Sequence, residues 1–431
     1  MKEAAADPHV AFPRPLAGKI VAIVHPAWHS CGSHGVFAAQ AQAYKRLGAQ
    51  TVSIAAADTP GCVEGTKCAA AYFAAASDID ADIRTFAGMP LREVLNSGFL
   101  RASIEWLHGN QALMRLEVAR RTPVPELRPR APHADLIHCN HFFTVPIAAR
   151  LRGRYGCPVM LETHDLQARQ YALHAPLGVK LPPAASYEDM LATECDVMRQ
   201  ADILVHLNAE EAQEFRRLLP GKRHALIYPA AGPMPAGAGG AEAILVAAAN
   251  YPNFLGVRWF LKEVLPLAPQ ARVRIYGGIA QFMRWRAPLL FTKHAGLFQG
   301  RVDGSILRGA YRNASAVLLP AVAGHGISIK TIEALSCGAP LIATKLAFRG
   351  FPPGATELAN VTIAEDAACF AAALARAHER RHLPGASRAS SPARRFYEQH
   401  FAFDTYCQSL FAAAGAVMQS GPRELSPFTS P

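Results

Sequence analysis

A glycine-rich turn followed by a short helix carries the residue types best suited to chemistry. The stretch 323–350 reads AGHGISIKTIEALSCGAPLIATKLAFRG, and its pattern predicts a strand, a turn, a helix and a second strand. Unpaired N–H groups at the start of a helix favour an anion. Lys330 and Glu333 lie three residues apart, so both occupy one helix face. A cation and a carboxylate behind an anion site suit a ligand with phosphate and ribose groups; the alternative is an ordinary turn with a surface ion pair.

Two further sets of candidate residues follow strands predicted in the first half of the chain. Gly32 and Gly35 lie in a small-residue loop after the apolar run 19–25, where the backbone either approaches a phosphate or sugar or simply turns. His164 follows the predicted strand 158–162, and the carboxyl end of a parallel strand is where such folds place working residues. Histidine there binds a polar substrate or exchanges protons, and the alternative is a residue that caps the strand.

Strands and helices alternate along both halves of the chain, which is the pattern of doubly wound parallel sheets. Short apolar runs predict strands in the first half at 19–25, 50–56, 135–138, 158–162, 202–207 and 225–228. The second half repeats the pattern, with strands expected at 243–249, 271–276, 316–319 and 341–344. Helices are expected at 36–47, 103–121, 187–200, 209–218, 255–264, 305–312 and 367–378. The loop at Gly32 lacks a strict GxGxxG, so a nicotinamide or flavin cofactor is a weak interpretation.

At 431 residues the chain is too long for one typical core, which predicts two domains. A passage rich in proline and glycine without charge separates the two halves and predicts a linker. We therefore expect a first domain at 1–228, a linker at 229–241, a second domain at 242–395, a C-terminal helix at 396–418 and a disordered tail at 419–431.

Net charge, cysteine content and apolar runs limit the binding partners and the cellular location that the sequence predicts. A net charge of +11 suits nucleic acid, a membrane surface or an anionic substrate, but the arginines are dispersed and form no nucleic-acid arm. The nine cysteines are scattered without a CxxC pair, which predicts reduced, mostly buried thiols in a cytosolic protein. We find no signal-peptide pattern at the N-terminus, no apolar run long enough to span a membrane, and no His/Cys cluster with metal-ligand spacing.

Several motifs, in order over roughly 100 residues, resemble the C-terminal domain of retaining family 4 glycosyltransferases of the GT-B fold. They are AAANYPNFLGVRWFLKEVLPLAP from 247, RIYGG from 274, GRVDG from 300, AYRNASAV from 310 and GHGISIKTIEALSCGAPLIAT from 324. The closest likeness is to bacterial polysaccharide and cell-surface sugar transferases. The resemblance implies two Rossmann-like domains facing each other across a cleft, acceptor side first and donor side second, with a C-terminal helix able to cross back.

The resemblance also implies roles for single residues. Glu333 would hold the ribose of a sugar nucleotide, Lys330 would neutralise its diphosphate, and His164 would lie near the donor sugar. The donor site is further assigned to the two first-half glycines, the arginine of GRVDG and the glycine turn: Gly32, Gly35, Arg301, His325, Gly326, Ile327 and Ser328. His325 departs from the family's usual pattern of two acidic residues eight apart, so the way the sugar hydroxyls are held differs here.

The resulting hypothesis is a retaining glycosyltransferase that moves a sugar from a nucleoside-diphosphate sugar to a saccharide, lipid-linked or polysaccharide acceptor. No cofactor, metal or nucleic acid is expected. The expected location is the cytoplasm, with peripheral association at the inner face of the cytoplasmic membrane. Two alternatives stay open: a non-catalytic GT-B-like binding or scaffold protein, which His325 favours, and a nucleotide-sugar epimerase.

Overall fold

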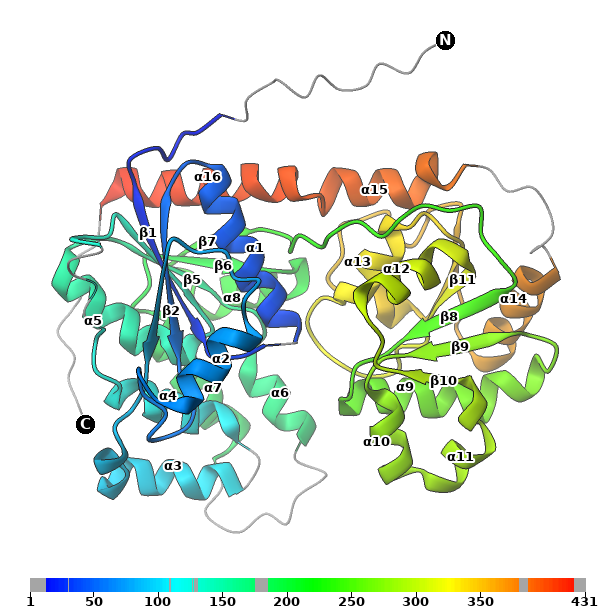
Figure 1. Cartoon of the computed structure of the whole chain (residues 1–431), viewed down its shortest axis with the longest axis horizontal. Helices are drawn as coiled ribbons and strands as arrows, with labels where there is room; N and C mark the ends of the chain where they lie inside the picture. Colours follow the sequence, from blue (N-terminus) through cyan, green and yellow to red (C-terminus); the bar gives the residue numbers. More distant parts are fainter. Residues whose placement is uncertain are drawn as a thin grey trace. The chain divides into compact units, whose positions relative to one another are not determined.

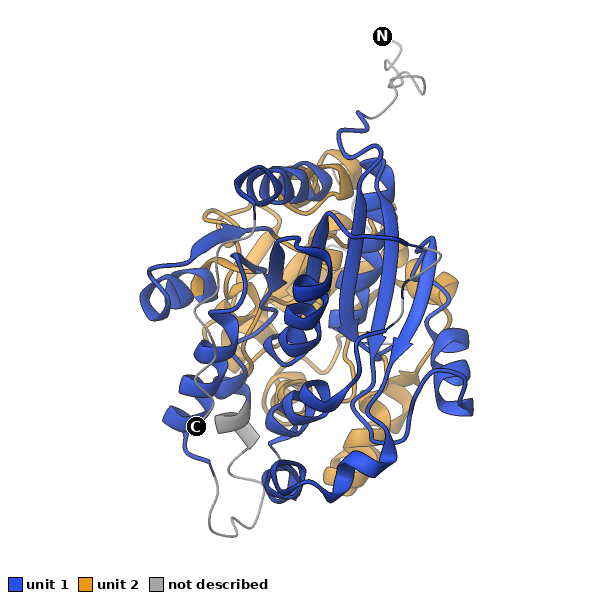
Figure 2. Ribbon diagram, turned by 90° about the vertical axis from the view of Figure 1, so that its left-hand side faces the viewer, with its two compact units in different colours: residues 1–207, 211–227, 406–431 blue, residues 208–210, 228–405 orange. Residues whose placement is uncertain are grey.

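The computed structural model describes residues 13–29, 31–107, 110–125, 127, 131–174, 185–379 and 387–421 (Figure 1). The chain divides into two compact units, each built on a parallel sheet with helices against both faces (Figure 2). Unit 1 comprises 1–207, 211–227 and 406–431, and unit 2 comprises 208–210 and 228–405. The predicted fold of two doubly wound parallel sheets is confirmed.

The described strands of unit 1 form a seven-stranded sheet with the order β3-β2-β1-β4-β5-β6-β7. Their bounds are β1 Ile20–Pro26, β2 Gln50–Ala56, β3 Ile83–Ala87, β4 Leu136–Asn140, β5 Val159–Glu162, β6 Ile203–His206 and β7 Arg223–Leu226. The helices are α1 Gly32–Arg46, α2 Lys67–Ala75, α3 Ser97–Leu107, α4 Gln111–Arg121, α5 Val145–Tyr155, α6 Gln167–His174, α7 Tyr187–Met198 and α8 Ala209–Leu218, with 3-10 turns η1 Leu91–Leu95 and η2 Phe142–Thr144. Buried apolar side chains cover the central strands, as a parallel sheet requires.

Unit 2 contains a six-stranded sheet of described strands with the order β10-β9-β8-β11-β12-β13. The strands are β8 Glu242–Val246, β9 Val273–Tyr276, β10 Phe298–Gly300, β11 Ala314–Leu319, β12 Leu341–Ala343 and β13 Val361–Ile363. The helices are α9 Tyr251–Trp259, α10 Ile279–Arg286, α11 Pro288–Lys293, α12 Gly304–Asn313, α13 Ile329–Ser336 and α14 Ala367–Glu379. Shorter helical turns are η4 Phe260–Val264, which is π-helical, η5 Leu265–Leu267, η6 Ala295–Leu297, η7 Lys345–Phe348 and η9 Arg388–Ser390.

The C-terminal helix expected at 396–418 is two helices, α15 Pro392–His400 and α16 Phe403–Ser420. The break falls at Phe401, whose φ of −129° leaves the helical region while its ring packs on Tyr228 and Phe351. From Tyr406 onward α16 belongs to unit 1. The tail expected from 419 is wrong at its first two residues, which are helical, and 422–431 lie outside the described residues.

Two other expectations about helices change. The helix expected at 36–47 begins earlier, because Gly32 and Gly35 lie in the first turn of α1 and neither has a positive φ. The helix expected at 103–121 is two helices, because the Asn110 side chain accepts a hydrogen bond from the Leu113 N–H and starts α4. Helix α2 and strand β3 were not predicted. Glycine and asparagine in these places therefore start helices instead of ending them.

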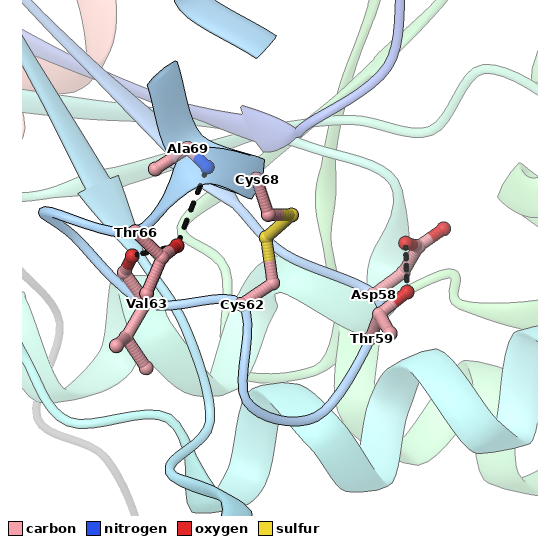
Figure 3. Close-up of a disulfide and its surroundings, with 7 residues drawn as sticks. All are labelled: Asp58, Thr59, Cys62, Val63, Thr66, Cys68 and Ala69. Carbon is pink, nitrogen blue, oxygen red and sulfur yellow. Dashed lines mark hydrogen bonds between the residues drawn. A yellow bond between two sulfur atoms is a disulfide. The ribbon is translucent and has the colours of Figure 1, made fainter. Parts of the chain in front are cut away.

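The expectation that all nine cysteines are thiols is wrong for one pair. Cys62, in the loop after β2, and Cys68, in the first turn of α2, form a disulfide (Figure 3). Their Cα atoms lie 5.7 Å apart because the loop turns back on itself before Thr66 caps α2. The described free thiols are buried at 139, 157, 195, 337 and 407 and exposed at 31 and 369.

A surface cavity of about 570 Å³ lies beside this loop. Gly61, Val63 and Glu64 line one side, and the end of β3 with Gly88 lines another. None of the site residues predicted from the sequence lines this cavity. Across the described residues, no helix is both long enough and apolar enough to cross a membrane.

Candidate functional site

Each sheet has one point where the strand order reverses, and several of the candidate residues follow the strands at that point. In unit 2 the first strand, β8, lies between β9 and β11, so the connections leave it in opposite directions. In unit 1 the first strand, β1, lies between β2 and β4 in the same way. Loops at the carboxyl ends of strands separate at such a point, and ligands of open α/β sheets bind there.

The glycine-rich turn follows β11 in unit 2. Gly324 and Gly326 have φ angles of 120° and 71°, in a region that side chains other than glycine rarely adopt. Ser328 then caps α13, because its hydroxyl accepts a hydrogen bond from the Thr331 N–H at 3.3 Å. Ile327 and Ser328 are half-buried. The turn and first helical turn therefore have the form predicted from the sequence, with N–H groups available at the edge of the sheet.

Lys330 joins the two sides of the switch point. Its ammonium group donates a hydrogen bond of 2.6 Å to the side-chain oxygen of Asn253, in the first turn of α9. Asn253 is oriented by two bonds: its N–H donates to Asn250, which caps α9, and its side-chain amide donates to the Ala248 carbonyl. The first turn of α9, which follows β8, therefore holds a cation from the first turn of α13, which follows β11.

Burial sets the proton affinity of Lys330. Removal from water lowers the pKa of Lys330 to about 8, the nearby Glu333 opposes this effect and Arg349 adds to it. A lysine with this pKa is still mostly protonated at neutral pH. Because so little water stabilises the ammonium group, an anion that reaches it would interact strongly.

Glu333 lies on the same face of α13, as predicted, and is half-buried. The buried Tyr311 on α12 donates a hydrogen bond of 3.1 Å to Glu333 Oε2. Burial raises the pKa of Glu333, while the Tyr311 bond and Lys330 oppose the shift. Tyr311 orients the Oε2 oxygen of Glu333, so the Oε1 oxygen would accept a hydrogen bond from a ligand hydroxyl group.

Two arginines complete this edge of unit 2. Arg301, predicted from the sequence, follows β10 and lies against the turn after β9, where a Cβ atom on Gly278 would come within 3.0 Å of its Nε. Arg349, which was not predicted, donates hydrogen bonds to the carbonyls of His325 at 3.1 Å and Leu346 at 3.0 Å. The His325 residue itself is exposed. Arg349 therefore anchors the backbone at the position where the expected carboxylate is replaced.

The predicted site residues fall into two groups, one in each unit. Unit 2 brings together seven of them at the carboxyl edge of its sheet: Arg301, His325, Gly326, Ile327, Ser328, Lys330 and Glu333. Unit 1 contains Gly32, Gly35 and His164, which follow β1 and β5. Residues that sequence reasoning missed include Asn253, Tyr311 and Arg349; the asparagine turn after β8 was visible, but its contact with Lys330 was not.

In unit 1 a pair of stacked histidines stands at the ends of adjacent strands. His141 follows β4 and His164 follows β5, and their ring centres lie 3.9 Å apart with an angle of 8° between the rings. Both have positive φ, 64° and 58°, which is uncommon for histidine and concentrates at functional sites. His141 also contacts Ser33 in the first turn of α1 at 3.2 Å. The His141–Ser33 contact therefore joins the segments that follow β4 and β1, the two strands at the reversal point of this sheet.

Both histidines are uncharged near neutral pH. Burial lowers the pKa of His164 to about 3, with a smaller contribution from His138. Burial also lowers the pKa of His141 well below its usual range, and His164 and Arg115 add to that shift. A neutral imidazole has one nitrogen that donates and one that accepts, so the tautomer decides what His164 does.

A buried amide network assigns that tautomer. The Asn140 side-chain amine donates to the Val24 carbonyl at 3.3 Å and to Gln40 at 2.8 Å, which fixes the Asn140 oxygen as the acceptor. His164 Nε2 lies 2.9 Å from that oxygen and therefore carries the proton. The other ring nitrogen, Nδ1, is left as an acceptor. His164 is thus suited to receive a hydrogen bond from a hydroxyl group and unsuited to act as a general acid.

Glu162 at the end of β5 is a buried carboxyl group whose two oxygens make no hydrogen bond. It pairs in register with Asn140 on β4. Burial raises the pKa of Glu162 well above its usual range, which favours the protonated, neutral carboxyl group. Burial raises the pKa values of Tyr44 on α1 and Tyr406 on α16, and a charge on Glu162 would add to both shifts.

Within the described ranges, no group of three or more histidine, cysteine, aspartate or glutamate residues is placed to hold a metal ion. The cations of the unit 2 edge are side chains: Lys330, Arg301 and Arg349. The three of them, with the glycine turn, form an edge suited to an anionic ligand.

The fold is that of the GT-B glycosyltransferases. Sucrose-phosphate synthase from Thermosynechococcus elongatus is similar over 94% of this chain and 100% of its own, with a TM-score of 0.61 and 15% identity. HepE from Anabaena in complex with UDP covers 92% of this chain and 100% of its own, with a TM-score of 0.58 and 15% identity. The pneumococcal O-GlcNAc transferase GtfA, in complex with UDP and GlcNAc, is similar over 93% of this chain and 99% of its own, with a TM-score of 0.56 and 10% identity.

The family match lies in unit 2. A model of the family described as glycosyl transferases group 1 matches residues 242–380, which include the glycine turn and α13. No curated protein matches the sequence. The resemblance to glycosyltransferases inferred from the motifs between 247 and 344 is therefore confirmed, and those motifs lie within the matched residues.

Replacing Asn140 should change the tautomer of His164. In Asn140→Leu, the acceptor for Nε2–H is lost and the Nδ1–H form should become populated. In Asn140→Asp, the acceptor stays but becomes charged, so the pKa of His164 should rise. The measurement is 15N NMR of histidine-labelled protein between pH 5 and 8, with the His164 signals assigned from a His164→Gln variant.

Wild-type protein should show a neutral Nε2–H imidazole throughout that range, because the pKa of His164 is about 3. His138 lowers the pKa of His164, His141 stacks on its ring, and Arg115 lowers the pKa of His141. An unchanged tautomer in Asn140→Leu would contradict the assignment.

Glu162→Gln should stabilise the protein at alkaline pH. A raised folded-state pKa means that the folded chain keeps a proton that the unfolded chain releases, so stability falls as pH rises above the ordinary value of 4.5. Between pH 6.5 and 8, removing this group should flatten the fall in unfolding free energy by up to about 1.4 kcal/mol per pH unit. Chemical denaturation at several pH values measures it.

The range from pH 6.5 to 8 is chosen because the buried histidines change the unfolding free energy only below pH 6.5. Their lowered pKa values make stability rise with pH there, which is opposite to the effect of Glu162. Burial raises the pKa of Glu194 to about 8, so Glu194 also makes the unfolding free energy fall as pH rises. This contribution is the same in the wild type and in Glu162→Gln. Glu263→Gln, at an exposed position, is the control. An equal slope in the wild type and Glu162→Gln would show that Glu162 is ionised in the folded protein.

Proposed function

We propose that this protein is a retaining glycosyltransferase of the hexosyltransferase type, with a nucleoside-diphosphate sugar as donor. The observation that carries the proposal is the placement of Lys330 between the glycine turn and Asn253, with Glu333 one turn further along α13. Together they offer N–H groups, a cation and a carboxylate at the carboxyl edge of one sheet. Phosphates, diphosphate charge and ribose hydroxyl groups are the chemistry that fits these three parts.

Each donor group has a proposed partner in unit 2. The backbone amides of Gly326, Ile327 and Ser328 bind the sugar and phosphate, and Lys330 neutralises the diphosphate. Glu333 accepts hydrogen bonds from the ribose, with its second oxygen held by Tyr311. Arg301 and Arg349 add positive charge. HepE and GtfA were each solved with UDP, which makes UDP the first nucleotide to test here.

The proposed reaction keeps the anomeric configuration of the sugar. The bond between the anomeric carbon and the phosphate oxygen breaks, and a bond to the acceptor hydroxyl oxygen forms on the same face. The acceptor's proton goes to the departing phosphate, so no enzymatic nucleophile is required. The protein contributes by positioning the donor and by stabilising negative charge as it develops on the diphosphate.

His325 and His164 distinguish this chain within the proposal. The exposed His325 stands where the family usually has its first acidic residue, and Arg349 holds its carbonyl. His164, as the Nε2–H tautomer, accepts a hydrogen bond at Nδ1 from a hydroxyl group of the donor sugar. The three cations supply the charge that a metal would otherwise provide, so we propose a metal-independent reaction without a cofactor, which added chelator should leave unchanged.

The acceptor is proposed to be a saccharide or a lipid-linked or polysaccharide intermediate. The net charge of +11 supports an anionic carrier or surface. A cytoplasmic location with peripheral attachment to the inner face of the membrane follows from such an acceptor. The alternatives predict different products: a scaffold would bind donors without transfer or hydrolysis, and an epimerase would isomerise the sugar nucleotide without an acceptor.

Glu333→Ala should abolish turnover of the sugar nucleotide. We expect at least a 100-fold loss in kcat/KM, about 2.7 kcal/mol, because the ribose loses its hydrogen-bond acceptor in a buried site. Glu263→Ala, at an exposed position in the same unit, is the matched control. A panel of nucleotide sugars screened by thermal shift first selects the donor. Full activity in Glu333→Ala with an intact fold would sink the assignment.

Donor affinity should depend on pH through Lys330. Binding of a diphosphate raises the pKa of Lys330 from about 8, so affinity is full below that pH and falls by up to about ten-fold per pH unit above it. Calorimetric titration with UDP, or with the diphosphate that the screen selects, covers pH 7 to 9.5. Lys330→Met should weaken binding and flatten this profile, and Lys330→Arg should flatten it with less loss. An unchanged pH profile in Lys330→Met would show that another group binds the phosphates.

A further inference from the structure

Helices α10 and α11 of unit 2 present large apolar side chains to solvent. Trp285 is 74% exposed and Leu289 is 88% exposed. Ile279 and Met283 anchor α10 because they are fully buried in the core of unit 2, and Leu290 and Phe291 of α11 pack against the same core. The exposed side chains therefore belong to a well-packed surface and not to a loose segment.

The same surface is strongly basic. The sequence between Glu263 and Asp303 contains no acidic residue but holds six cations: Arg272, Arg274, Arg284, Arg286, Lys293 and Arg301. Arg284, Arg286 and Lys293 are exposed beside Trp285 and Leu289. Among the residues that the structure describes, none of these three forms an ion pair with a carboxylate, whereas Arg274 pairs with Glu242 at 2.6 Å.

Ring contacts hold two of these cations against the apolar surface. The Arg286 guanidinium lies 5.0 Å from the ring centre of Trp285, and the Arg284 guanidinium lies 5.1 Å from that of Phe291. Cations and apolar side chains therefore alternate among the exposed residues of the two consecutive helices. We define the exposed residues Arg284, Trp285, Arg286, Leu289 and Lys293 as the α10–α11 surface.

This combination fits an anionic lipid surface. Tryptophan favours the level of the headgroups, leucine gains by entering the acyl region, and arginine and lysine bind lipid phosphates. A single-stranded nucleic acid would also use the cations and the indole ring. It would, however, leave Leu289 without apolar surroundings, which a bilayer supplies.

We propose that the α10–α11 surface docks this protein on a membrane that contains anionic lipids. Helix α10 begins directly after β9, at the sheet edge that carries the glycine turn. Docking would therefore hold that edge of unit 2 close to the lipid headgroups. The proposal does not depend on the glycosyltransferase activity, because lipid binding is measured without any sugar substrate.

The test is co-sedimentation of the full chain with vesicles of equal parts phosphatidylglycerol and phosphatidylcholine, and with vesicles of phosphatidylcholine alone. Binding should be at least about ten-fold stronger to the anionic vesicles and should weaken in 0.5 M salt. The triple variant Arg284→Gln/Arg286→Gln/Lys293→Gln should bind on the order of 100-fold more weakly, since each surface cation contributes about five-fold. Trp285→Ser/Leu289→Ser should lose binding by about ten-fold or more.

A matched control removes three exposed cations elsewhere in unit 2, in Arg308→Gln/Arg376→Gln/Arg395→Gln. The control should bind vesicles nearly as well as the wild type, and all variants should keep the wild-type melting temperature. A second control, Leu100→Ser/Ile104→Ser, removes exposed apolar side chains from α3 of unit 1.

Four results would overturn the proposal. They are no binding to anionic vesicles, equal loss in the control triple variant, loss in the α3 variant while the α10–α11 variants still bind, and binding of a single-stranded oligonucleotide in place of vesicles. Loss of vesicle binding confined to the two α10–α11 variants would support it.

Discussion

The hydrogen bond from Lys330 to Asn253 is the contact on which the unit 2 edge depends. It joins the loop after β11 to the loop after β8, the two loops that a reversal of strand order would otherwise leave apart. The hydrogen-bond partner of the ammonium group is a neutral amide, and the nearby Glu333 carboxylate offsets only part of its charge. The edge therefore holds a cation beside the glycine turn, and a phosphate ligand would interact favourably with it.

In unit 1, neutral side chains make the contacts at the point where the strand order reverses. Its central strands end in a buried layer of amide and imidazole side chains, in which Asn140 is fixed by the Val24 carbonyl and in turn fixes His164. Nearly every member is hydrogen-bonded, so the layer is rigid and specifies protonation as well as position. Glu162 is the exception, and its neutral state is what makes its burial tolerable.

Much of this was visible in the sequence. Period and composition predicted both parallel sheets, and Lys330 and Glu333 share a helix face because three-residue spacing requires it. Local patterns failed where tertiary contacts decide: Gly32 and Gly35 lie in a helix, and Cys62 pairs with Cys68 through a loop whose path the spacing did not show. Contacts across the sheet, such as those of Asn253, Tyr311 and Arg349, depend on strand order, which single-residue patterns do not encode.

The positive φ angles of His141 and His164 carry a cost that the fold does not need. Glycine would adopt either conformation freely, whereas histidine costs on the order of 1–3 kcal/mol at each position. A chain selected for stability alone would exchange both. That two adjacent strand ends each keep a strained imidazole suggests a trade of stability for chemistry, and substitutions that stabilise this edge would be expected to weaken the protein's activity.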